Sequence, residues 1–81
     1  MLDAEAVSAK ARVFPRWHYV PEIMDCDDAA HAFRAFVGHG VGIALNHKHA
    51  WNIALCRDGV WHIEPQNGNM TRRRWALLVV I

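Results

Sequence analysis

The stretch HAWNIALCRDGVWHIE, residues 49–64, decides the fold that we predict for this chain. Its two halves, residues 49–56 and 60–64, are rich in Val, Ile and Trp, a composition typical of β-strands. Between them stands Asp58-Gly59, a strong hairpin signal because glycine tolerates the positive φ that tight turns need. We therefore predict an antiparallel hairpin at the centre of the domain.

Strands and helices extend outward from this hairpin. Residues 41–45 and 75–81 have the same strand-like composition. Residues 25–37 form the clearest helical pattern, with apolar side chains at steps of three and four, and residues 3–12 form a second one. Helices followed by consecutive strands predict an α+β domain with a mostly antiparallel sheet of about four strands.

Length and composition limit what the chain can be. Its 81 residues suffice for one domain, which we take as residues 1–81, and a hydrophobic share of 53% favours a compact globule. A net charge of +1 gives no global attraction to nucleic acid or to a membrane, so we expect neither partner. The first residues contain no apolar run for a signal peptide or membrane anchor, which makes the cytoplasm the default expectation.

Cys26 stands at the predicted start of the helix over residues 25–37, with Asp25 as its N-cap. The unpaired N–H groups and the dipole of a helix N-terminus stabilise a thiolate, the reactive form of cysteine. The same N–H groups are suited to stabilise an oxyanion on a bound carbonyl. Cys26 is therefore a candidate nucleophile, and the alternative is a buried, inert cysteine.

His49 and Glu64 are the candidate partners of this nucleophile, as base and as the carboxylate that orients the base. A two-residue turn at Asp58-Gly59 pairs Ile53 with Glu64, which leaves His49 and Glu64 on one face but about 13 Å apart. The two side chains can meet only if the hairpin has a shifted or bulged register.

Three carboxylates, Asp25, Asp27 and Asp28, flank Cys26 and oppose thiolate formation by like-charge repulsion. One solution is a calcium ion held by these aspartates together with Glu64, which would lower the local negative potential. The alternative is that the aspartates only cap the helix.

Four motifs occur in a characteristic order: Tyr19-Val20-Pro21-Glu22, Asp25-Cys26-Asp27-Asp28, His49-Ala50-Trp51-Asn52 and Glu64-Pro65-Gln66. Over residues 19–68 the chain resembles the papain-like cysteine peptidase domain at the C-terminus of certain fungal agglutinins and in related phage-encoded proteins, and more distantly the transglutaminase-like core. The resemblance implies a minimal papain-like fold and calcium-dependent cleavage of peptide or amide bonds in a peptide or protein substrate. Cys26, His49 and Glu64 fall on the catalytic positions.

Two other functions remain open at this point. One is a non-catalytic, phage-associated binding or structural module that keeps the fold, and the other is transglutaminase-like acyl transfer to an amine. We also interpret the tryptophans as core residues, the run Arg72 to Arg74 as a solvated turn, and the apolar strand over residues 75–81 as buried in the sheet or paired with a second copy in a homodimer.

Overall fold

The computed structural model describes residues 1–14 and 26–80, with residues 26 and 27 described by their backbone alone. Two helices, α1 (Ala4–Val13) and α2 (Cys26–Val37), precede a five-stranded sheet. The strands are β1 (Val41–Leu45), β2 (Ala50–Cys56), β3 (Gly59–Ile63), β4 (Met70–Thr71) and β5 (Leu78–Val80). All four strand pairs are antiparallel, so the predicted α+β class is confirmed.

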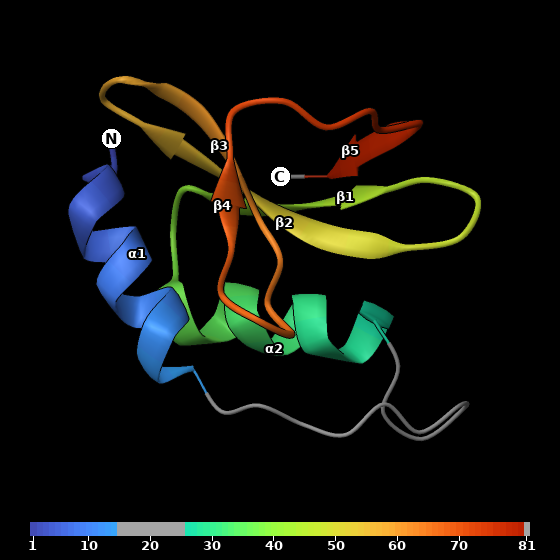
Figure 1. The fold of residues 1–81 in the computed structure, drawn as a ribbon, viewed down its shortest axis with the longest axis horizontal. Helices are drawn as coiled ribbons and strands as arrows, with labels where there is room; N and C mark the ends of the chain where they lie inside the picture. The colour runs from blue at the N-terminus through green and yellow to red at the C-terminus, as the bar shows by residue number, and fades with distance from the viewer. Residues whose placement is uncertain (15–25, 81) are drawn as a thin grey trace.

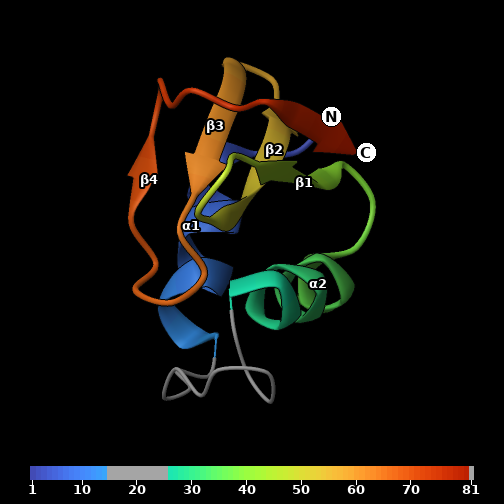
Figure 2. The ribbon, with the colours of Figure 1, turned by 90° about the vertical axis from the view of Figure 1, so that its right-hand side faces the viewer.

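The strand order is β4-β3-β2-β1-β5, so the chain crosses from one edge of the sheet to the other between β4 and β5. This crossing segment passes over the side of the sheet that faces away from α2 (Figures 1 and 2). The short strand β4 was not predicted. Side chains of this crossing segment can therefore pack on the outer face of the sheet.

The main core lies between the helices and the inner face of the sheet. The edge-to-face pair Phe14 and Phe33, with ring centroids 5.1 Å apart, packs there beside Ala54 and Cys56 of β2. The outer face has its own small cluster around Trp51, Ile53 and Ala76. Trp51 is fully buried, whereas Trp75 is 65% exposed, so the prediction that the tryptophans form the core is wrong for Trp75. Trp17 lies outside the described residues.

The register of the central hairpin is shifted from the simplest pairing, as a contact between His49 and Glu64 requires. Cys56 pairs with Gly59 and Ile53 with His62, two residues away from the simplest pairing of Ile53 with Glu64. The loop is therefore Arg57-Asp58, and Gly59, at φ 118°, is the first residue of β3. Asp58 stabilises this loop by accepting from the Trp61 indole N–H at 3.0 Å.

Strand β5 forms an edge of the sheet, and its three apolar side chains are exposed. Pairing of this strand with a second copy stays a prediction. In the described part of the chain, neither helix is long and apolar enough to cross a membrane.

Candidate functional site

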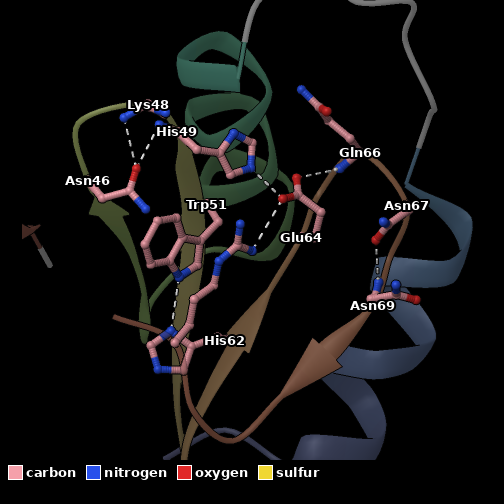
Figure 3. Close-up of polar contacts among 10 residues, drawn as sticks. Asn46, Lys48, His49, Trp51, His62, Glu64, Gln66, Asn67 and Asn69 are labelled. Carbon is pink, nitrogen blue, oxygen red and sulfur yellow. Dashed lines mark hydrogen bonds and ion pairs between the residues drawn. The ribbon is translucent and has the colours of Figure 1, made fainter. Parts of the chain in front are cut away.

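His49 immediately precedes β2, and the preceding loop fixes its direction. The side chain of Asn46 accepts from the backbone N–H groups of Lys48 and His49, both at 2.9 Å (Figure 3). The Asn46 N–H in turn donates to the His49 carbonyl at 2.9 Å. An asparagine that closes a turn in this way is a common device for reversing the chain. The backbone of His49 is therefore held on both sides of its Cα atom.

Glu64 immediately follows β3 and opens a tight turn. Its carbonyl accepts from the Gly68 N–H at 2.7 Å, and its N–H donates to the Asn69 carbonyl at 2.9 Å. Pro65 is fully buried directly after it. The turn also brings the Gln66 N–H to 3.4 Å from Oε2 of the Glu64 carboxylate. Glu64 thus has a defined position although it lies outside the strand.

The structure brings His49 and Glu64 together. The two side chains point toward one another, and His49 Nε2 pairs with Glu64 Oε1 (Figure 3). The observed register explains this contact, because pairing of Asn52 with Ile63 sets Glu64 level with Trp51, the residue two positions after His49. Since Nε2 is engaged by the carboxylate, Nδ1 is the ring nitrogen left to exchange a proton with a third group.

Cys26 is the first residue of α2, as its N-cap pattern predicts. Ala30, one turn later, packs against Ala50 at the start of β2, and the Asn52 amide donates to the Ala30 carbonyl at 2.9 Å. The start of α2 and the β1–β2 loop lie at the same end of the molecule in both views (Figures 1 and 2). The helix therefore begins at the sheet end that carries His49 and Glu64.

Arg74 is a site residue that the sequence interpretation missed. Its guanidinium lies 3.3 Å from Glu64 Oε1, the oxygen that also faces His49, and its Cζ atom lies 4.2 Å from the centroid of the Trp51 ring. Arg72 makes a similar pair of contacts, to Asp58 and to the Trp61 ring. Both side chains are exposed, as the prediction of a solvated arginine turn requires, but each also makes an ion pair and a ring contact that were not predicted.

His62 completes the surroundings of Trp51. The Trp51 indole N–H donates to His62 Nδ1 at 2.9 Å, which requires an unprotonated Nδ1 (Figure 3). Burial lowers the pKa of His62, and the positive charge of Arg74 lowers it further. The neutral ring is therefore favoured next to the guanidinium.

The second cysteine, Cys56, is a buried free thiol. Burial raises its pKa, and the charge of Asp58 raises it further, so both effects disfavour the thiolate. Cys56 has the properties of an inert core residue.

The predicted calcium ligands are not assembled by the described residues. Asp25 lies outside them, as does the side chain of Asp27, and Asp28 is exposed. Glu64 directs its carboxylate to His49, Arg74 and the Gln66 N–H, and the nearby guanidinium disfavours a second cation. Within residues 1–14 and 26–80, no three His, Cys, Asp or Glu side chains form a group that could hold a metal ion. Calcium binding by Glu64 together with the three aspartates stays a prediction.

No family model matches this sequence, and no curated protein matches it. Among solved structures, the chain is similar to one described as the PSL1a-E64 complex, with a TM-score of 0.71 and 26% sequence identity. The similarity covers 86% of this chain and 34% of that one. The chain therefore spans about a third of the length of the protein that it resembles in structure.

Proposed function

We propose that this domain is a thiol hydrolase of the papain-like and transglutaminase-like kind, which cleaves peptide or amide bonds. Cys26 is the nucleophile, His49 the general base and acid, and Glu64 the carboxylate that orients His49. The observation that carries the proposal is the contact between His49 Nε2 and Glu64 at the sheet end where α2 begins. The structural similarity to the PSL1a-E64 complex supports a shared fold. The E64 of that complex, which is not residue Glu64 of this chain, is a first ligand to try.

The chemistry follows from which ring nitrogen is engaged. Glu64 holds Nε2, so Nδ1 of His49 accepts the proton of the Cys26 thiol. The thiolate forms a bond to the substrate carbonyl carbon, and the backbone N–H groups at the start of α2 stabilise the oxyanion. As the C–N bond breaks, the leaving amine takes the proton from Nδ1.

The second half of the reaction regenerates the thiol. Water, deprotonated by His49 Nδ1, attacks the thioester, and the carboxylic acid product leaves as the proton returns to the Cys26 sulfur. The Glu64 carboxylate stabilises the imidazolium that forms in each half without taking up its proton. No step in this scheme involves a metal ion, and calcium binding by Asp25, Asp27, Asp28 and Glu64 stays a separate prediction.

Alkylation of Cys26 by iodoacetamide, followed across pH by peptide mass spectrometry, tests the proposal. We expect Cys26 to react at pH 6 to 7 about tenfold or more faster than an ordinary thiol, and His49→Ala to remove this excess. Cys56 in the same sample is the internal reference, because a buried thiol with a raised pKa reacts slowly. An ordinary alkylation profile for Cys26, unchanged by His49→Ala, contradicts the proposal.

A substrate assay then separates hydrolysis from acyl transfer. With a peptide amide and an added primary amine, the hydrolase releases free acid, whereas an acyl transferase incorporates the amine. Incorporation as the main product would replace hydrolysis with acyl transfer as the assigned reaction.

A further inference from the structure

We propose that Arg74 is a positioning residue that fixes the Glu64 carboxylate against His49, and that Trp51 supports it. This inference rests on the proposed function, because it assigns the group that holds the orienting carboxylate in place. Its basis is that one oxygen, Glu64 Oε1, lies against both His49 Nε2 and the Arg74 guanidinium, the latter at 3.3 Å. Arg74 lies in the segment that crosses the sheet between β4 and β5, so this segment brings the positive charge to Glu64.

Trp51 gives Arg74 a rigid support. The indole ring is fully buried, and its N–H is bound to His62 Nδ1 at 2.9 Å, so the ring has a fixed orientation. The guanidinium lies over its face, 4.2 Å from the ring centroid. A planar guanidinium can stack on an aromatic ring and still direct its N–H groups at a carboxylate, which lysine does less well. Stacking on Trp51 therefore fixes the plane of the Arg74 guanidinium, and the ion pair with Glu64 fixes the direction of its N–H groups.

Glu64 gains a second anchor from this arrangement. Within residues 1–14 and 26–80, the one further group at hydrogen-bond distance from this carboxylate is the Gln66 N–H, at 3.4 Å, which is long for a hydrogen bond. The side chain of Glu64 is 14% exposed and that of His49 is 24% exposed, so water can compete for the carboxylate. A charge-assisted contact from Arg74 restricts the carboxylate to the orientation in which Oε1 meets Nε2.

Arg72 provides a matched control within the same segment. Its guanidinium lies 4.0 Å from the centroid of the Trp61 ring and 3.0 Å from Asp58 Oδ2, which repeats the stacking and the ion pair of Arg74. The Arg72 contacts lie at the turn end of the hairpin, away from Glu64. Arg72→Ala therefore measures how much a stacking and ion-pair contact of this kind contributes to the stability of the fold, without any effect on Glu64.

The first test uses a readout that does not depend on Cys26. In ¹⁵N-labelled protein, we expect the wild type to show a protected imidazole Nε2–H signal for His49. Arg72→Ala should retain this signal, and Arg74→Ala should lose it or broaden it. Arg74→Lys, which keeps the charge, should restore part of its intensity. Retention of the full signal in Arg74→Ala would overturn the inference.

The second test is a double-mutant cycle on the rate of Cys26 alkylation at pH 7. We expect Arg74→Ala and Glu64→Ala each to lower the rate about tenfold, and the double variant to be no slower than Glu64→Ala alone. Arg74→Lys should recover part of the rate, whereas Arg72→Ala should match the wild type. Independent, multiplying effects of the two substitutions would contradict a role of Arg74 through Glu64.

The two tests separate this inference from the proposed function. If wild-type alkylation proves insensitive to His49→Ala while the imidazole signal still depends on Arg74, the proposed function fails and the positioning role stands. If alkylation of Cys26 depends on His49, but Arg74→Ala changes neither the imidazole signal nor the alkylation rate, the positioning role fails and the proposed function stands. Thermal unfolding of each variant verifies that it is folded, and Arg74→Lys serves if Arg74→Ala is not.

Discussion

Asn52 offers the sharpest prediction about what holds α2 against the sheet. It is fully buried on β2, and its side-chain amide donates to the Ala30 carbonyl of α2 at 2.9 Å and to the Gly42 carbonyl of β1 at 3.0 Å. Its Oδ1 atom is buried and accepts no hydrogen bond within the described residues. Both useful contacts of this side chain therefore depend on the N–H donors of the amide.

The magnitude for Asn52→Ala follows from these contacts. Loss of two hydrogen bonds costs about 1–3 kcal/mol of unfolding free energy, and the cavity adds about 1 kcal/mol. Removal of the unpartnered Oδ1 returns about 1 kcal/mol. The net destabilisation is about 2 kcal/mol, which corresponds to a fall in Tm of about 8–16 °C for a domain of this size.

Asn52→Asp should cost more, and its cost should depend on pH. An introduced carboxylate would face the Ala30 and Gly42 carbonyl oxygens without a donor, so we expect a loss of about 4 kcal/mol at pH 7. The folded state would favour the protonated carboxyl and raise its pKa above the unfolded value of about 3.9. Stability would therefore be retained below about pH 4 and lost as the pH rises toward 7.

Thermal unfolding followed by far-UV circular dichroism at pH 4 and pH 7 measures both effects. Asn69→Asp is the matched control, because Asn69 is exposed and its change should stay within about 0.5 kcal/mol. If Asn52→Asp is as stable as Asn52→Ala at pH 7, or if the difference between them does not vary with pH, the account of this contact is wrong.

Two further predictions concern His62 and Gly59. Because the pKa of His62 is lowered from its ordinary value of 6.5, the unfolded chain binds the proton more readily, and stability should fall as the pH drops below 6.5. His62→Gln should make the Tm less sensitive to pH between 7 and 5, and an unchanged slope would contradict the assignment. Gly59→Ala should lower stability by about 1–2 kcal/mol or more, because Gly59 has φ 118° and a Cβ atom there would lie 3.1 Å from Arg72. Gly38→Ala, at φ 101° but with open space around it, isolates the backbone part of this cost in the same denaturation assay.

The sequence was sufficient for most of the fold because its strong patterns are local. Apolar spacing identified both helices, and the runs rich in Val, Ile and Trp located β1, β2 and β3 to within a residue at each end. The hairpin does not have the simplest pairing at Asp58-Gly59 but the shifted register that a contact between His49 and Glu64 requires. The sequence alone did not define this shift, since Asp58-Gly59 can close a turn in more than one way and the choice depends on contacts from Trp61 and Arg72. The two-residue strand β4 is too short to produce a pattern.

The sequence predicted those parts of the candidate site that can be recognised from residue type and order. His49 and Glu64 were identified as partners, and the register that brings them together is shifted by two residues from the simplest pairing. Arg74 could not be identified in the same way, because its position depends on the pairing of β5 with β1 across the whole sheet. A long-range pairing of this kind leaves no periodic signal near residue 74.

The most direct measurement of the central claim is covalent trapping of an acyl group on Cys26. The protein is incubated with an activated peptide ester, quenched in acid and digested, and the position of the thioester is read by mass spectrometry. We predict acylation of the peptide that contains Cys26 in the wild type, about 100-fold less in His49→Ala, and none on the buried Cys56. Equal labelling of Cys26 with and without His49, or no thioester at all, would contradict the assignment of this site as a cysteine nucleophile with its base.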